Sequence, residues 1–186
     1  MHPLKLILDN YPEGKSEELV CPNHPQKPEM GTRTVTMSRE LWIEQEDFAE
    51  VPPKGYRRLT SARDYLPETK SGTAGADSVK TKAAIHWLDA QTAVPAQFRM
   101  YDRLFTVPQP DSAEDFLDVL NRDSKFVSQG FVEPNVAAAA PDAGFLTRYQ
   151  FERVGYFVTD IKDHSADHPV LNLAVGLRDS WGKNAK

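Results

Sequence analysis

The pattern of apolar and polar positions predicts many short strands. Between residues 79 and 88, apolar or small side chains fill the odd positions, whereas Lys80, Lys82 and His86 fill even ones. A period of two is typical of a half-buried strand. Shorter apolar or β-branched runs predict further strands, at residues 4–8, 32–37, 41–43, 156–158 and 170–175. We therefore expect a mainly β fold.

Helix signals are few. Ser112 is a candidate N-cap, acidic residues follow it, and apolar side chains recur at Phe116, Leu117 and Leu120. This spacing predicts a helix over residues 112–120. A second short helix is expected at residues 136–140, ended by the proline that follows. With so many strands and two small helices, β-barrels or a sandwich are the favoured architectures.

Composition narrows the class of protein. The 186 residues suffice for one large domain or two small ones, and no apolar run approaches the roughly 20 residues that span a bilayer. The single cysteine, Cys21, excludes an internal disulfide and is typical of a reducing cytosol. A net charge of −5 argues against a non-specific polyanion binder, because such proteins are usually basic.

Charge is unevenly distributed along the chain. The segment from Lys54 to Arg63 carries four cations and no acid, whereas residues 40–50 are strongly acidic. A local basic patch on an acidic body suits contact with a short stretch of RNA. Solvated faces of unrelated strands explain the same pattern, and charge alone favours that simpler interpretation.

The pattern predicts no metal site. His164 and His168 are four residues apart, which would place them on one face of a helix, but Pro169 follows and strands flank the segment. We expect a loop there. Residues 21–24 resemble half a zinc site without a second pair of ligands at suitable spacing, so we expect a structural turn.

Five short blocks combine arginines, aromatics and turn residues in a fixed order along the chain. They are Asn23–Arg33, Ile85–Trp87, Tyr101–Phe105, Phe151–Phe157 and Gly176–Trp181. Together the blocks resemble the C-terminal anticodon-binding region of bacterial glutaminyl-tRNA synthetases, which are class I aminoacyl-tRNA synthetases. The likeness runs from about residue 3 to residue 181 and so covers nearly the whole chain.

The resemblance implies two β-barrels, similar to the fold of ribosomal protein L25, with one or two short helices. The proximal barrel is expected from residues 3–51 and 104–181, and the distal barrel from residues 52–103. Paired prolines within Glu50–Gly55 mark the expected crossing between them, because proline ends a strand ladder. Family members continue after the position of Thr60 with a basic hairpin that this chain lacks, so we expect a shortened distal barrel.

Gln150 and Arg153 are the first candidate RNA contacts. On a continuous strand Gln150 and Glu152 would share one face, and Phe151 and Arg153 the other. Single-stranded RNA loops are recognised through base edges, which amides and arginines on rigid strands are suited to bind. The resemblance implies that Gln150 reads the middle uridine of the anticodon and that Arg153 supports the loop. An exposed strand with one aromatic anchor is the alternative.

Four further contacts are implied by the resemblance. Arg58 stands where the family contacts the last anticodon base, and arginine can donate two hydrogen bonds to guanine. Arg57 stands where lysine is commoner, Gln26 replaces asparagine, and Ser180 replaces threonine. The alternative for the two arginines is a solvated strand edge. Six aromatic residues are assigned to the core, because aromatics at alternating strand positions usually fill a barrel core, and stacking platforms for bases are the alternative: Trp42, Trp87, Tyr101, Phe105, Tyr156 and Phe157.

The chain is not expected to catalyse a reaction alone. It lacks the His-x-Gly-His and Lys-Met-Ser-Lys motifs of class I synthetase catalytic domains, and it has no glycine-rich phosphate loop. The resemblance implies that ATP and Mg²⁺ serve the catalytic domain of the parent enzyme, with no cofactor in this chain. Its expected partners are the anticodon loop of glutamine tRNA and that catalytic domain. We expect a cytoplasmic monomer without membrane contact.

Three alternatives remain open from the sequence. One is a β-barrel that docks another protein and no longer reads RNA, which the acidic charge favours. Another is the same region of a glutamate-specific relative, because the amino acid is chosen in the catalytic domain. A ribosomal-RNA binder on a related barrel ranks last, because it would need more cations.

Overall fold

A computed structural model describes residues 2–24, 26–51, 54, 85–139, 147–151 and 153–177. The chain divides into two compact units, which are described separately. Unit 1 comprises residues 1–93 with 131–134, and unit 2 comprises residues 94–130 with 135–186.

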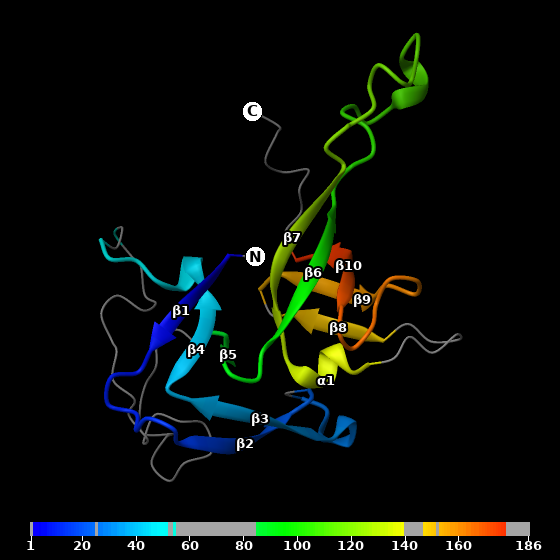
Figure 1. The fold of residues 1–186 in the computed structure, drawn as a ribbon. Coiled ribbons are helices and arrows are strands. Elements are labelled where there is room, and N and C mark those ends of the chain that lie inside the picture. The colour runs from blue at the N-terminus through cyan, green and yellow to red at the C-terminus, as the bar shows by residue number, and fades with distance from the viewer. Residues whose placement is uncertain are drawn as a thin grey trace. The chain divides into compact units, whose positions relative to one another are not determined.

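The described part of unit 1 forms two antiparallel sheets (Figure 1). In the first, β1 (Pro3–Ile7) pairs with β4 (Glu40–Glu44), which pairs with β5 (Trp87–Asp89). In the second, β2 (Ser16–Pro22) pairs with β3 (Thr32–Ser38) along the full length of both strands. Among the described residues of unit 1, two single-turn 3₁₀ helices accompany them, η1 (Pro28–Met30) and η2 (Gln45–Asp47).

The core of unit 1 combines residues of β3 and β4 with residues of the segment after β1. Leu8, Tyr11, Met37 and Leu41 are buried together, and Trp87 packs against them. The hydroxyl of Tyr11 donates to Glu17 Oε1 at 3.0 Å, so this buried ring keeps a polar partner.

Residues 131–134 also belong to unit 1, and two contacts hold them against its sheets. The rings of Trp42 and Phe131 stack with centroids 4.5 Å apart. Arg33 donates two hydrogen bonds to the carboxylate of Glu133, at 2.7 and 3.0 Å. Such a bidentate pair is the strongest geometry for a guanidinium and a carboxylate.

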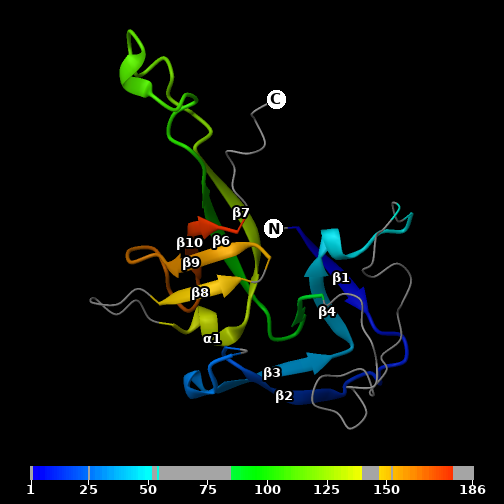
Figure 2. The same ribbon diagram turned by 180° about the vertical axis from the view of Figure 1, so that it is seen from behind.

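Unit 2 is built on a five-stranded sheet with the order β7-β6-β10-β9-β8. Its strands are β6 (Val94–Tyr101), β7 (Lys125–Val132), β8 (Arg148–Phe151), β9 (Gly155–Thr159) and β10 (Val170–Gly176). Strands β8, β9 and β10 pair antiparallel, whereas β10 runs parallel to β6. Figure 2 shows the same sheet from behind.

One face of this sheet, here called the inner face, carries the core of unit 2. The rings of Phe98, Phe151 and Phe157 contact one another edge to face, with centroids 5.0 to 5.7 Å apart. Leu171 is completely buried, and Tyr149 packs its ring against Phe151. Three strands therefore contribute to one aromatic cluster.

The loop between β9 and β10 is held in place by a buried histidine. Buried His164 places Nδ1 3.2 Å from the backbone of Val170 and Nε2 3.2 Å from the carbonyl oxygen of Ala137. Ala137 ends the short helix α1 (Pro134–Ala137). The histidine therefore joins the loop to both a strand and a helix.

The sequence predictions fare unevenly. The mainly β class is confirmed. The short helix expected at residues 136–140 is found two residues earlier, as α1, and ends at Ala137. The strand expected over residues 79–88 lies largely outside the described residues. So does most of the predicted distal barrel, and the barrel boundaries at residues 51 and 104 stay predictions.

The helix predicted over residues 112–120 is wrong. The segment holds one 3₁₀ turn, η5 (Pro110–Ser112), followed by further turns. The hydroxyl of Ser112 donates back to the carbonyl oxygen of Gln109, and the Asp115 carboxylate accepts the N–H of Leu117. Such local bonds compete with helical ones. Phe116 and Leu117 are each 55% exposed, so no packing partner stabilises a helix here.

Candidate nucleic-acid interface

The face of the unit 2 sheet opposite the aromatic cluster, here called the outer face, carries the sequence-predicted Gln150. Arg148 and Gln150 alternate along β8 with Tyr149 and Phe151, which point to the inner side. Gln150 pairs with Tyr156 of β9. Directly opposed residues on antiparallel strands lie on the same face, about 4.5–5.5 Å apart at Cβ. An exposed amide therefore stands beside an exposed phenol ring.

Tyr156 continues this face toward β10. It lies opposite Val175, after an irregularity in the pairing between Leu173 and Val175. The Tyr156 side chain is 43% exposed, whereas the next residue, Phe157, is completely buried. Because β9 is an interior strand of the sheet, the exposure of Tyr156 comes from the face it occupies and not from a sheet edge.

Arg153 lies in the turn that joins β8 to β9, with φ of 65°. The turn is closed by a hydrogen bond from the N–H of Val154 to the carbonyl oxygen of Phe151 at 3.1 Å. The strand ends at Phe151, so the expectation that Arg153 shares a strand face with Phe151 is wrong. A left-handed non-glycine residue costs roughly 1–2 kcal/mol and is often retained at functional sites.

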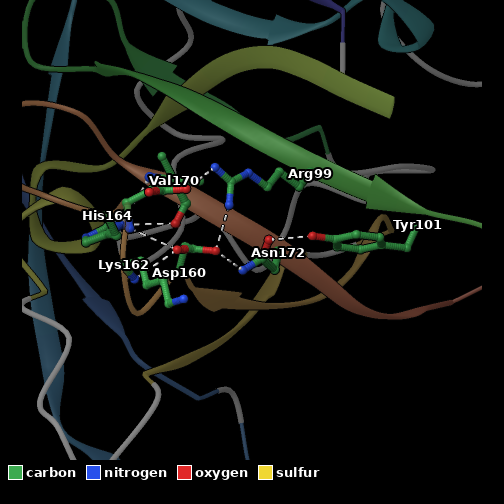
Figure 3. Close-up of polar contacts among 8 residues, drawn as sticks. Arg99, Tyr101, Asp160, Lys162, His164, Val170 and Asn172 are labelled. Atoms are coloured by element: carbon green, nitrogen blue, oxygen red, sulfur yellow. Dashed lines mark hydrogen bonds and ion pairs between the residues drawn. The ribbon is translucent and has the colours of Figure 1, made fainter. Parts of the chain in front are cut away.

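A polar network occupies the β6 and β10 part of the outer face (Figure 3). Asp160 Oδ2 accepts hydrogen bonds from Arg99 Nη1 at 2.8 Å and from Asn172 Nδ2 at 2.7 Å. The hydroxyl of Tyr101 donates to Asn172 Oδ1 at 2.9 Å. Arg99 also pairs with Asp163. The network joins two strands to the β9–β10 loop and fixes the Asn172 amide.

Asp160 stays ionised in this setting. Its burial disfavours the charged carboxylate, but hydrogen bonds from Asn172 and from the backbone N–H groups of Asp163 and Lys162, with the positive charge of Arg99, outweigh it. Together they lower the pKa of Asp160 from its ordinary 3.8 to about 2. The hydrogen bond to Asp163 raises the pKa of Arg99. The pair is therefore a fixed ion pair at neutral pH.

A shallow pocket of about 240 Å³ adjoins the network. Its lining residues are Val158, Thr159, Asp160, Ile161, Lys162 and Asn172. Val158 lies opposite Arg148 of β8 and Asn172 of β10. The pocket thus opens on the same face as Gln150 and Tyr156.

The roles of the six sequence-predicted contact residues stay predictions, and the structure gives only the positions of three of them. Gln150 and Arg153 belong to one hairpin of unit 2. Gln26 lies in unit 1, in the connection between β2 and β3, where it is exposed and donates its backbone N–H to His24 Nδ1 at 3.1 Å. Arg57, Arg58 and Ser180 lie outside the described residues.

The assignment of six aromatic residues to the core is wrong for two of them. Phe157 is buried, and Trp42, Trp87 and Phe105 are partly buried. Tyr101 and Tyr156 are each 43% exposed. Tyr156 is the site residue that sequence reasoning missed. The sequence carried no clear signal for it, because the pairing of position 156 with Gln150 depends on the register of β8 and β9.

The metal and turn predictions concern residues that the structure describes. Residues 163–168 form a loop between β9 and β10, as predicted. Within the described parts of the chain, no three histidine, cysteine, aspartate or glutamate side chains gather as a metal site. The turn after β2 is held by Asn23, whose Nδ2 donates to the carbonyl oxygen of Met30 at 2.9 Å. Among the described helices, none is long and apolar enough to span a membrane.

Two family models match the chain. Both are described as the anticodon-binding domain of class I tRNA synthetases (E and Q), and they match residues 1–65 and 84–160. The second match contains β8, β9 and the turn between them. Gln150, Arg153 and Tyr156 therefore all lie inside a matched range.

Curated relatives agree with these matches. The glutamine–tRNA ligase of Cupriavidus necator is 50% identical, and those of Ralstonia pickettii and Xylella fastidiosa (strain 9a5c) are each 45% identical. Each alignment covers 98% of this chain and 36% of the relative. The chain thus spans about a third of the length of these relatives. The alignment with the Cupriavidus protein is 212 residues long, so that protein holds residues without a counterpart among the 186 here. The matches together show that the chain belongs to the anticodon-binding domain family of class I tRNA synthetases (E and Q).

Proposed function

We propose that this chain recognises the anticodon loop of glutamine tRNA as part of a glutamine–tRNA ligase. The observation that carries the proposal is 50% identity to a glutamine–tRNA ligase over 98% of the chain. The exposed amide of Gln150, held on a paired strand inside the matched range 84–160, supports it.

Gln150 is the proposed reader of the middle uridine. A glutamine amide offers both a donor and an acceptor, which matches the adjacent N–H and carbonyl groups on the edge of uracil. Its strand is fixed by pairing with β9, and Phe151 anchors it in the aromatic cluster. A preorganised reader loses little conformational entropy on binding.

The remaining contacts have supporting roles in this proposal. Arg153 supports the loop from the turn beside Gln150. Arg58 donates to O6 and N7 of the final guanine, with Arg57 beside it. Gln26 and Ser180 make secondary polar contacts.

The rest of the enzyme enters the proposal through the relatives. They are about three times longer than this chain, and we assign the remainder to a catalytic domain that uses ATP and Mg²⁺ to attach glutamine. The chain's share is to check the identity of the tRNA. A monomeric state and a cytoplasmic location complete the proposal, and the free cysteine Cys21 agrees with a reducing compartment.

Binding to an anticodon stem–loop tests this function. The chain is titrated with the glutamine loop, with a loop whose middle U is replaced by A, and with one whose final G is replaced by C, at two salt concentrations. We expect the cognate loop to bind most tightly at both. Equal affinity for all three loops would overturn the proposal. Tighter binding of the loop that ends in C, which carries a glutamate anticodon, would favour a glutamate-specific relative.

Residue variants sharpen the same titration. Gln150→Ala is expected to weaken cognate binding by about 1–3 kcal/mol, roughly 5- to 150-fold, because the uracil edge loses its partner. Gln129→Ala is the matched control, because Gln129 is an exposed glutamine on β7, the opposite edge strand of the same sheet. Equal losses in the two variants would contradict the role given to Gln150.

A protein-docking role is the second candidate. It is favoured by large apolar side chains exposed on the segment between β6 and β7 and on β7 itself: Leu104, Phe116, Leu117, Phe126 and Val127. Exposed apolar groups of this kind are typical of protein contacts. A stem–loop titration without any binding would move this candidate ahead.

A further inference from the structure

The outer face of the unit 2 sheet carries an exposed tyrosine ring on β9, the strand next to the edge strand β8. Tyr156 is flanked by Gln150 on one neighbouring strand and by Val175 on the other, and all three side chains are exposed. Strand β9, which carries Tyr156, is anchored on its inner face by Phe157, which is completely buried. A rigid strand therefore presents a flat ring beside a base-reading amide.

This arrangement combines the two parts needed to hold an unstacked base. An aromatic face binds any base by stacking, and a neighbouring polar group selects among bases through their edges. Val175 and Val158 extend the apolar surface around the ring on β10 and β9. A base lying on Tyr156 would bring its edge toward Gln150.

Charge on the outer face also suits a nucleic acid. Arg148 lies on β8 two residues before Gln150, and Lys162 lines the pocket beside Val158. The pocket's carboxylate, Asp160, is bound by Arg99 and Asn172, which reduces its repulsion of a phosphate. Two cations therefore stand near the path of a strand that crosses this face.

We propose that Tyr156 stacks against the nucleotide whose edge Gln150 reads. The inference rests on the proposed function and adds a specificity-neutral contact to it. Stacking supplies affinity for any base at this position, whereas Gln150 supplies the preference for uridine. The two contributions are therefore separable by mutation.

Photocrosslinking tests the contact directly. The chain is irradiated in complex with the glutamine stem–loop carrying 5-iodouridine at the middle anticodon position, and the crosslinked peptide is mapped. We expect the crosslink at Tyr156, because the iodinated base lies against its ring. A crosslink at Tyr101 or Tyr149, or none in a complex that forms, would overturn the proposal.

Affinity measurements separate the ring from the amide. Tyr156→Ala is expected to weaken cognate and middle-A loops alike, by about 5- to 150-fold, whereas Tyr156→Phe keeps wild-type affinity. Tyr101→Ala is the matched control, because Tyr101 is equally exposed but lies on β6, and it is expected to leave affinity within about twofold. Equal losses from Tyr101→Ala and Tyr156→Ala would overturn the assignment.

The outcomes distinguish this inference from the function beneath it. If Gln150→Ala abolishes the preference for uridine while Tyr156→Ala binds like wild type, stacking is overturned and anticodon reading stands. If Tyr156→Ala weakens every loop but the wild type does not discriminate among loops, the ring binds RNA and anticodon reading fails. No binding by the wild-type chain would overturn both.

Discussion

The two faces of the unit 2 sheet come from the same strands, but one is a buried aromatic core and the other exposes an amide and a tyrosine ring to solvent. On the inner face, Phe98, Phe151 and Phe157 pack edge to face with centroids 5.0 to 5.7 Å apart. On the outer face, Gln150 and Tyr156 stand exposed beside each other. Adjacent residues of one strand, Tyr156 and Phe157, thus have opposite environments.

The difference implies that the inner face stabilises the fold, whereas Gln150 and Tyr156 on the outer face are available for binding. Burial of apolar area supplies most of the stability of a fold, so substitutions on the inner face should change the free energy of unfolding. The outer face exposes a ring and an amide whose removal costs the fold little. Substitutions of these two side chains should change RNA affinity and leave the free energy of unfolding nearly unchanged.

The largest expected effect is that of Phe157→Ala. This change removes a fully buried ring from the aromatic cluster, and we expect a loss of about 3–5 kcal/mol in the free energy of unfolding. The neighbouring Tyr156→Ala is expected to cost less than about 1 kcal/mol. Denaturant unfolding of both variants checks the comparison, and similar losses would contradict the division into two faces.

Gly155→Ala probes how closely β9 and β10 approach each other at the start of β9. A Cβ on Gly155 would lie 2.6 Å from the carbonyl oxygen of Val175 and 2.8 Å from Leu173 Cδ1. The backbone of β10 must shift to admit it, and we expect a loss of about 1–3 kcal/mol by denaturant unfolding. Unchanged stability would show that β9 and β10 separate more easily than this contact implies.

Asp160→Asn tests the polar network of the outer face. Loss of the charge that holds Arg99 is expected to cost about 1–3 kcal/mol at pH 7. Folding lowers the pKa of Asp160 from 3.8 to about 2. The ionised carboxylate therefore stabilises the fold fully above pH 3.8, the pKa in the unfolded chain, and this contribution is lost as the pH falls toward 2. Unfolding at several pH values should therefore show wild type and variant converging below pH 3.8.

Asp163→Asn is the control for that measurement. Its carboxylate also pairs with Arg99 but is 53% exposed, so we expect a loss of less than about 1 kcal/mol. A larger loss than that of Asp160→Asn would reverse the order of importance within the network.

The smallest expected effect is that of Arg148→Gln. Arg148 is exposed on the outer face, so unfolding should be unchanged. If it meets a phosphate, the slope of log K against log salt for stem–loop binding should fall by about 0.7 in magnitude. An unchanged slope would remove Arg148 from the RNA path and leave Gln150 and Tyr156 unaffected.

The sequence was informative where periodicity decides structure. Alternation predicted the mainly β class, and family resemblance located Gln150 on a strand. Sequence prediction failed where the structure depends on whether a segment finds another part of the chain to pack against. Residues 112–120 have the spacing of a helix, but Phe116 and Leu117 find no surface to pack against and remain exposed.

The site was only half predictable for a related reason. Arg153 has a left-handed conformation in the turn, and the strand ends at Phe151, two residues earlier than an alternation continued through Arg153 assumes. Which aromatic residue faces solvent depends on the register of two strands, and a run such as Tyr156-Phe157-Val158 fits either register by hydrophobicity alone. The paired position opposite Gln150 settles the question.

The parallel pairing of β10 with β6 has a kinetic consequence. It brings Val170 opposite Gln97 and Asn172 opposite Arg99. The long segment between the two strands must form a closed loop before this pairing can stabilise the fold. Loop-closure entropy makes such non-local contacts slow to form. The local β8–β9–β10 meander should therefore assemble first, and β6 should join it in the step that limits the rate of folding.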